Sequence, residues 1–161
     1  MTQYTIFPSP VGDLWLTSDG TALTGVWMDS RKPDVSHARR CDDLSIFDSA
    51  KGWLDAYFAG AHREIDFPLS PAGTAFQRRV WALLSAIPYG ETTTYGALAR
   101  ELGPKMSAQA VGQAVGRNPI AIILPCHRVL GAKGQLTGYA GGLEIKKWLL
   151  CHEDSLRREN L

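Results

Sequence analysis

The sequence predicts an α/β protein in two parts, with a small sheet before residue 70 and mostly helices from residue 71 onward. Three observations lead to this prediction. Short apolar runs separated by turn residues fill the first 28 residues, which is typical of strands. Apolar residues spaced three and four apart recur later, which is typical of helices. Between these regions, residues 65–73 carry two prolines and favour an extended linker, because proline donates no backbone hydrogen bond.

The composition is that of an ordinary globular protein. The chain has 161 residues, 45% hydrophobic and 20% charged, so it can form a sizeable core. No window approaches the roughly 20 consecutive apolar residues of a membrane span. The N-terminus lacks the basic and apolar regions of a signal peptide. We therefore expect a cytoplasmic protein that has no membrane partner.

The first part is expected to hold three strands and one helix. The strands are expected at residues 4–7, 14–18 and 23–28, with turn residues between them. Residues 29–43 are polar and contain a proline, so a loop is expected there. A helix is expected at residues 47–58, because its apolar residues share one face and Gly60 follows.

The second part is expected to hold four helices. Three of them begin after the capping residues Thr74, Thr94 and Ser107. The first ends before Pro88, and the next two, at residues 95–102 and 108–115, are so close in sequence that they form a helix-turn-helix pattern. The last helix is expected at residues 143–152, and its inward face is expected to carry Ile145, Trp148 and Leu149.

The second helix of the helix-turn-helix is rich in alanine and glycine. This composition allows tight packing against the preceding helix, and it equally suits a recognition helix in a DNA groove, where bulky side chains would block access.

The two halves of the chain differ in net charge. Residues 1–70 hold 6 Lys and Arg against 10 Asp and Glu, whereas residues 71–161 hold 11 against 6. The basic half can supply phosphate contacts, although a random split of surface charge explains the numbers as well.

The chemistry is expected around one of the three cysteines. Cys41, Cys126 and Cys151 form neither a disulfide framework nor a zinc motif. A strand-like apolar run, residues 120–124, leads to Cys126, which His127 and Arg128 follow. Neighbouring cations depress the pKa of a thiol and favour a thiolate nucleophile. Neighbouring side chains on a strand point to opposite faces, so His127 can act on Cys126 only at a bend or through a water molecule.

Four segments carry a resemblance to a known family. They are PYGETTTYG at 88–96, AVGQAVGRNP at 110–119, PCHRV at 125–129 and TGYAGGLEIKKWLLCHE at 137–153. In this order they resemble the O6-alkylguanine-DNA alkyltransferases, or methylated-DNA–protein-cysteine methyltransferases. The resemblance implies a ribonuclease-H-like sheet domain at residues 1–70. It also implies a mainly helical domain at residues 71–161 for DNA binding and alkyl transfer.

The resemblance also implies an activity, which is DNA repair by direct reversal. O6-alkylguanine, and less well O4-alkylthymine, would be flipped out of duplex DNA, and its alkyl group would move irreversibly to Cys126 in a single turnover. No cofactor is implied, because the DNA is the alkyl donor. Residues 1–70 offer only His37, Cys41 and His62 as metal ligands of the zinc-binding kind, so no metal is expected. A monomer in solution is expected, with cooperative binding on DNA left open.

Catalytic roles follow from the resemblance residue by residue. Cys126 would be the nucleophile, His127 its base through a water molecule, and Glu153 the group that orients His127. Asn118 would brace the turn that carries the cysteine. Tyr95 would rotate the target phosphate and donate a hydrogen bond to guanine.

The resemblance also places the pocket and the DNA contacts. The pocket would be formed by Tyr139, Ala140, Gly141, the carbonyl of Val129 and Lys146, while Arg128 would make a structural salt bridge. The DNA contacts would come from Tyr95, Arg100, Lys105, Ala108, Gln109, Ala110 and Arg117. Gln109 stands where the family has an arginine that fills the gap left by the flipped base, so we expect weaker DNA binding or slower flipping.

Three other functions remain as alternatives. A non-enzymatic lesion-recognition protein of the alkyltransferase-like type would bind damage without transfer, although such proteins lack the acceptor cysteine. A cysteine hydrolase using Cys126, His127 and Glu153 would turn over many times. A helix-turn-helix regulator would bind a defined sequence and would not need Cys126.

Overall fold

The structure is a computed structural model that describes residues 2–139 and 141–153. The chain divides into two compact units. The first unit contains the chain up to Ala72 together with Pro119–Ile123, and the second contains Gly73–Asn118 together with the chain from Leu124 onward. Among the described residues, no helix has the length and apolar character needed to cross a membrane. The mixed α/β architecture predicted from the sequence is confirmed.

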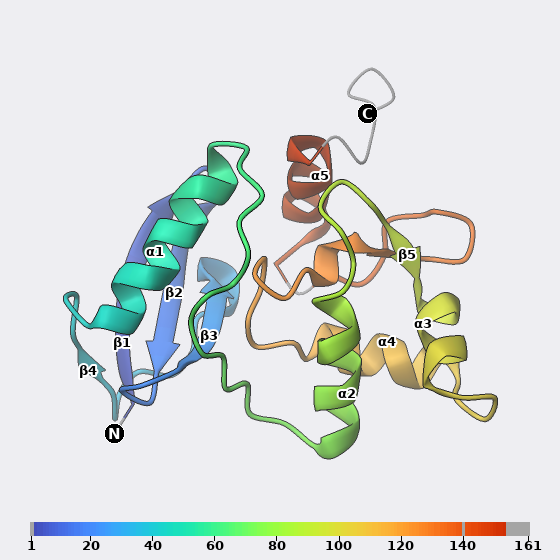
Figure 1. Cartoon of the computed structure of the whole chain (residues 1–161), viewed down its shortest axis with the longest axis horizontal. Coiled ribbons are helices and arrows are strands. Elements are labelled where there is room, and N and C mark those ends of the chain that lie inside the picture. Colours follow the sequence, from blue (N-terminus) through green and yellow to red (C-terminus); the bar gives the residue numbers. More distant parts are fainter. Residues whose placement is uncertain (1, 140, 154–161) are drawn as a thin grey trace. The chain divides into compact units, whose positions relative to one another are not determined.

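The first unit is built on a four-stranded sheet in the order β3-β2-β1-β4. Its elements are β1 (Gln3–Ser9), β2 (Gly12–Ser18), β3 (Leu23–Met28), the 3-10 helix η1 (Asp29–Arg31), β4 (Arg39–Arg40) and α1 (Ser45–Phe58). The first three strands run antiparallel, whereas β4 pairs in parallel with β1. Figure 1 shows α1 lying across one face of this sheet.

The core of the first unit lies between the sheet and α1. Leu14 and Leu16 alternate along β2 and are fully buried, as expected for a strand with one face on the core. Phe47 and Leu54 of α1 are fully buried as well. The three predicted strands and the predicted helix are confirmed. Strand β4 lies within the predicted loop, and its two exposed residues carry no apolar alternation that could indicate a strand.

The apolar run before Cys126 is not a strand, which corrects the prediction for residues 120–124. Only its beginning pairs with the sheet: Val26 N donates to Pro119 O at 2.9 Å, and Ala121 N donates to Val26 O at 3.1 Å. The chain then turns sharply, because Ile122 has a φ of 69° and Ile123 N donates back to Ala121 O at 2.7 Å. Its side chains are apolar because the turn is buried.

The second unit carries the predicted helices. Its elements are α2 (Ala75–Leu84), β5 (Thr93–Thr94), α3 (Tyr95–Leu102), α4 (Ala108–Gly116), η2 (Cys126–Arg128), β6 (Val129–Leu130) and α5 (Leu143–His152). All three predicted caps are present: the side chains of Thr74, Thr94 and Ser107 each accept from the backbone N–H three residues on. Helices α3 and α4 form the predicted helix-turn-helix.

Helix α4 packs tightly and still leaves one face open. Val111, Ala114 and Val115 are buried, and the indole N–H of Trp81 on α2 donates to Ala114 O at 2.8 Å. A Cβ at Gly112 would lie 3.6 Å from the Tyr95 ring, so α3 and α4 approach closely there. The opposite side, with Gln109 and its neighbours, is exposed. The small residues therefore serve packing on one side and leave access on the other.

Helix α5 buries a charged residue and exposes an aromatic one. Lys146 and Leu149 are fully buried, whereas Trp148 is 37% exposed and stacks on His152 with ring centroids 5.0 Å apart. The expected inward face of this helix is therefore wrong for Trp148. Lys146 lies inside instead, where the backbone carbonyls of Val129 and Thr137 accept its hydrogen bonds.

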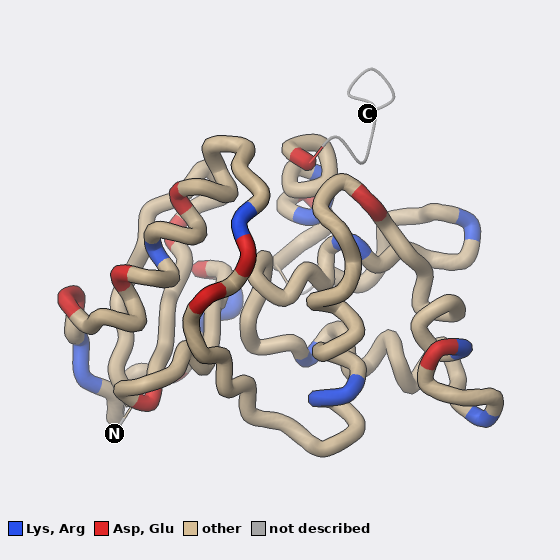
Figure 2. Tube along the Cα trace, in the orientation of Figure 1, with Lys and Arg blue, Asp and Glu red and all other residues tan. Residues whose placement is uncertain are grey.

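Charge is distributed differently over the two units. Figure 2 shows acidic residues along α1 and on the segment that follows it. In the second unit, basic residues occur on α2, at the connection between α3 and α4, and on the loop after β6. They do not gather in one cluster over these described elements.

Candidate active site

Cys126 is delivered into the interior of the second unit by two consecutive turns. Pro125 has φ −80° and ψ 67°, and Cys126 N donates to Leu124 O at 2.7 Å, which is an inverse γ-turn. Cys126 then begins the short helix η2 and is 9% exposed. The bend required for His127 to approach the thiol is therefore present.

Asn118 braces this turn from the end of α4. Its side-chain Nδ2 donates to Leu124 O at 2.8 Å. Burial raises the pKa of the Cys126 thiol, while a hydrogen bond from Asn118 and the charge of Lys146 act to lower it. Burial has the larger effect, so the resting thiol is protonated and needs a base to become a nucleophile.

His127 and Glu153 form a fully buried pair. His127 Nε2 lies 2.6 Å from Glu153 Oε2. Because an ionised carboxylate only accepts hydrogen bonds, Nε2 carries the proton and Nδ1 has the lone pair. Nδ1 is buried and has no hydrogen-bond partner among the described residues. Burial lowers the pKa of His127 in opposition to Glu153, so the ring is neutral and able to accept a proton at Nδ1.

Glu153 is held by several donors at once. Arg128 Nε lies 2.7 Å from Oε1 and Nη2 lies 3.2 Å from Oε2, which is a bidentate pair. Burial acts to raise the pKa of Glu153, but the hydrogen bonds and charges of His127 and Arg128 lower it to about 2. The carboxylate is therefore ionised throughout the neutral range. The expected salt bridge of Arg128 is present, and Glu153 is its partner.

The turn at residues 87–90 supports this pair and was not predicted as part of the site. Arg128 Nη1 donates to Ile87 O at 2.6 Å, and the Tyr89 ring centroid lies 5.7 Å from the guanidinium carbon. The Tyr89 hydroxyl donates to His152 O at 3.4 Å, and Gly90 N donates to Glu153 Oε1 at 3.4 Å. The PYG triplet at 88–90 was a signal for this turn, but its contacts lie 39 or more residues away in sequence.

Lys146 and Tyr95 meet at one carbonyl. Lys146 Nζ donates to Val129 O and to Thr137 O, both at 2.7 Å, and the Tyr95 hydroxyl donates to Thr137 O at 3.2 Å. Burial lowers the pKa of Lys146 to about 8, against the opposing effect of Cys126. Burial raises the pKa of Tyr95 and keeps its phenol protonated. Parallel pairing of β5 with β6 ties the start of α3 to the segment after the cysteine.

The predicted pocket residues are described in part. The Tyr139 hydroxyl is buried and has no hydrogen-bond partner among the described residues, and burial raises its pKa well above 10. Gly141 is half-buried. Ala140, a predicted pocket residue, lies outside the described residues. Val129 is fully buried, and its carbonyl accepts from Lys146.

The predicted DNA-contacting residues lie on the helix-turn-helix and directly after it. Tyr95 and Ala110 are half-buried, and the others are exposed. The full set is Tyr95, Arg100, Lys105, Ala108, Gln109, Ala110 and Arg117. Tyr95 is both a predicted DNA contact and a neighbour of the active site, because it begins α3 and contacts the loop that carries Thr137. No group of three or more His, Cys, Asp or Glu suited to a metal ion occurs among the described residues.

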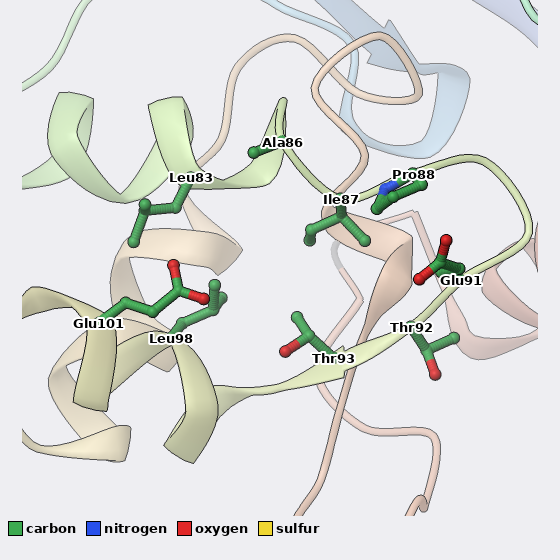
Figure 3. A pocket seen from close by; sticks show the side chains of 9 residues that line it. All are labelled: Leu83, Ala86, Ile87, Pro88, Glu91, Thr92, Thr93, Leu98 and Glu101. Carbon is green, nitrogen blue, oxygen red and sulfur yellow. The ribbon is translucent and has the colours of Figure 1, made fainter.

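A separate pocket of about 210 Å³ lies between the end of α2, the segment before β5, and α3. Figure 3 shows Leu83, Ile87 and Leu98 around it, with two glutamates, Glu91 and Glu101. Ile87 and Pro88 of its wall belong to the turn that supports Arg128.

A helix-turn-helix beside a buried cysteine, histidine and glutamate defines a class of DNA-binding proteins with a thiol at the centre of the site. The comparisons with known proteins narrow this class. Residues 2–71 match the ribonuclease-like domain of 6-O-methylguanine DNA methyltransferase, and residues 75–155 match its DNA binding domain. The chain belongs to the 6-O-methylguanine DNA methyltransferase family, which confirms the resemblance seen in the sequence.

Relatives and solved structures agree with this assignment. The methylated-DNA–protein-cysteine methyltransferase of Methanosarcina acetivorans is 48% identical over 153 residues, which cover 94% of this chain and 98% of the relative. The structure of the Mycobacterium tuberculosis O6-methylguanine methyltransferase matches with a TM-score of 0.86 and 47% identity, covering 96% of this chain and 94% of that one. The same mycobacterial protein in complex with DNA matches with a TM-score of 0.86 and 47% identity, covering 95% of this chain and 93% of that one. The chain is therefore a DNA-binding methyltransferase of DNA repair.

Proposed function

We propose that the chain removes the alkyl group from O6-alkylguanine in duplex DNA and takes it irreversibly onto Cys126. The observation that carries this proposal is a network of buried contacts around Cys126. Asn118 contacts the thiol, and the neighbouring His127 pairs with Glu153, which in turn pairs with Arg128. A soft thiolate is the nucleophile suited to displacement at an alkyl carbon. The target carbon is paired and stacked in the duplex, so the base must be flipped out first.

The proposed step conserves atoms and charge. His127 Nδ1 accepts the thiol proton through a water molecule, and the imidazolium that forms is stabilised by Glu153. The thiolate attacks the alkyl carbon, a carbon–sulfur bond forms, and the bond from carbon to O6 breaks with its electron pair on guanine. The Tyr95 hydroxyl, which donates to Thr137 O in the structure, would turn to donate a hydrogen bond to the departing base. The base takes up one proton, which balances the proton that the thiol lost. The thioether does not hydrolyse, so each molecule reacts once.

The remaining residues are assigned to the base and the DNA. The loop of Tyr139, Ala140 and Gly141 would wall the base pocket, and the Val129 carbonyl would accept from the guanine amino group. On the helix-turn-helix, Gln109 would fill the gap left by the base. The exposed charges assigned to the phosphates are Arg100, Lys105 and Arg117, with Ala108 and Ala110 allowing close approach.

We assign these roles to two functional domains, residues 1–70 and 71–161, with the chemistry in the second. We also propose that the protein acts as a monomer in the cytoplasm. The three cysteines are all unpaired, as is usual in a reducing compartment. O4-alkylthymine is proposed as a poorer substrate, and cooperative binding to DNA is compatible with this assignment.

The proposal is tested by the stoichiometry of repair. Duplex DNA with one O6-methylguanine is mixed in tenfold excess over the protein, and the repaired strand is counted over time. The proposal predicts a plateau at one repaired lesion per protein molecule. Continued turnover would instead support a cysteine hydrolase. Lesion binding with no repair would support a recognition protein.

A further inference from the structure

The turn at residues 87–90 contacts both members of the Arg128–Glu153 ion pair, which adjoins His127. Its Ile87 carbonyl accepts from Arg128 at 2.6 Å, and its Tyr89 ring lies beneath the Arg128 guanidinium with a centroid distance of 5.7 Å. Its Gly90 N–H points at Glu153 Oε1 at 3.4 Å. One short turn therefore holds the cation and touches the carboxylate.

The turn also lies close to the backbone of Glu153, at a position occupied by a glycine. Gly90 has a φ of +80°, which side chains rarely adopt, and a Cβ at this position would lie 3.2 Å from Glu153 O. The backbone conformation and the short approach act together. The sequence needs glycine at this position to bring the turn against Glu153.

On its other side the same turn faces the 210 Å³ pocket. Ile87 and Pro88 line this pocket together with Glu91, as Figure 3 shows. Ile87 itself is buried and its N–H donates to Leu84 O at 3.1 Å, so the end of α2 holds the start of the turn. Tyr89 and Gly90, further along the turn, contact Arg128, His152 and Glu153 on the side away from the pocket wall.

We propose that Tyr89 is a positioning residue for His127, which acts by holding Arg128 against Glu153. The inference rests on the proposed role of His127 as the base. Arg128 shares the carboxylate with His127, so the place of the guanidinium decides how much of the Glu153 charge the imidazole receives. The charged and titratable groups that face His127 are Cys126, Arg128, Lys146 and Glu153.

The direction of the effect follows from these charges. Arg128 acts to lower the pKa of His127, and Glu153 acts to raise it. When Arg128 moves away, His127 loses a nearby positive charge and gains a larger share of the carboxylate. Its pKa then rises, and His127 is protonated, and so unable to act as a base, at a higher pH than before.

The test is a pH titration of the histidines by NMR. The chain has four histidines, so a ¹⁵N–¹H spectrum of the imidazole rings is simple, and a His127→Gln protein assigns the signal. Tyr89→Leu removes the ring under the guanidinium, and Tyr89→Phe keeps it. Leu83→Ala is the matched control, because Leu83 also lines the pocket but belongs to α2 and not to the turn. Thermal unfolding reports the stability of each variant.

The proposal predicts that Tyr89→Leu raises the His127 midpoint by about half a pH unit, while Tyr89→Phe and Leu83→Ala leave it in place. An unchanged midpoint in folded Tyr89→Leu would overturn it, as would an equal rise in Leu83→Ala. If Tyr89→Leu does not fold, Gly90→Ala displaces the same turn from its backbone and must raise the midpoint.

A parallel assay separates this inference from the proposed function. The rate of methyl transfer from duplex DNA is measured against pH for the same proteins. A parallel upward shift of the acidic limb in Tyr89→Leu supports both. Absence of methyl transfer in the unaltered protein contradicts the proposed function alone, because the NMR midpoint still decides the role of Tyr89.

Discussion

Lys146 is the buried cation that acts on the Cys126 thiol. Its ammonium group donates to two carbonyls in the interior and its pKa is lowered by burial to about 8, so it is charged at neutral pH. Its charge acts to lower the pKa of Cys126. A charge at this place costs stability and favours the thiolate, as is usual for residues that serve a reaction.

Replacement of Lys146 by methionine is therefore expected to raise the pKa of Cys126 by about one unit and to slow methyl transfer about tenfold at neutral pH. The thiol pKa is measured from the pH dependence of iodoacetamide alkylation in a Cys41→Ser, Cys151→Ser background. Lys147→Met is the control, because it removes a neighbouring cation of the same helix. Equal thiol pKa values in the two variants would contradict the assigned role.

Gln109 is the residue where the resemblance to the family leads us to expect an arginine. It is exposed near the start of α4. Gln109→Arg is expected to tighten binding to lesion-containing duplex several-fold and to speed repair, because arginine adds charge and a planar group. Fluorescence anisotropy measures the affinity, and transfer from free O6-alkylguanine is expected to stay unchanged. Gln113→Arg adds the same charge one turn further on, so an equal gain there would show a merely electrostatic effect.

At the scale of the elements, α4 depends on its cap. The Ser107 hydroxyl accepts from Ala110 N at 3.0 Å and begins a helix with two glycines and three alanines. Ser107→Ala is expected to cost about 1 kcal/mol of unfolding free energy, measured by urea denaturation. It should also weaken DNA binding, since α4 carries the proposed contacts. Ser107→Thr keeps the hydroxyl and should recover both, and a failure to recover would contradict the capping account.

The helices and strands were largely predictable because their signals are local. Three helix starts were predicted from the capping residues Thr74, Thr94 and Ser107, and apolar spacing predicted the helix around Leu54. The two-residue strands were not predictable, because they pair through the backbone and need no apolar pattern. The strand predicted before Cys126 was wrong because the apolar pattern there belongs to a buried turn, and a buried turn can be as apolar as a buried strand.

The candidate site divides in the same way. Cys126 and His127 are adjacent in sequence and stand out there, and the family resemblance added Glu153, Asn118 and Tyr95. Helical spacing could not show that Lys146 of α5 is buried and Trp148 exposed. The burial of Lys146 depends on the carbonyls of Val129 and Thr137, which the fold brings nearby. The turn at Tyr89 was equally hidden, since its partners are distant in sequence.

At the scale of the whole molecule, the ionised Glu153 carboxylate of the site contributes to the free energy of unfolding. Its pKa is about 2 in the folded state against 4.5 for an ordinary glutamate, so the folded state favours the ionised form. This contribution is fully present above pH 4.5 and is lost as the pH falls toward 2. Its size is on the order of 3 kcal/mol.

Glu153→Gln is expected to lower the unfolding free energy near pH 7 by about 3 kcal/mol, because Arg128 is left buried without its ionic partner. The difference from the unaltered protein should shrink as the pH falls from 4.5 toward 2. Urea denaturation at a series of pH values measures both. An exposed acid, Glu144→Gln on α5, is the control, and a difference that stays constant with pH would contradict the depressed pKa of Glu153.

The central claim is that Cys126 takes the alkyl group from DNA. The most direct measurement is intact-protein mass spectrometry after incubation with duplex DNA that contains one O6-methylguanine, with Cys126→Ser as the control. We expect a single methyl increment that maps to Cys126 and is absent from the control. An unmodified protein that still binds the lesion, or a methyl group on another residue, would contradict it.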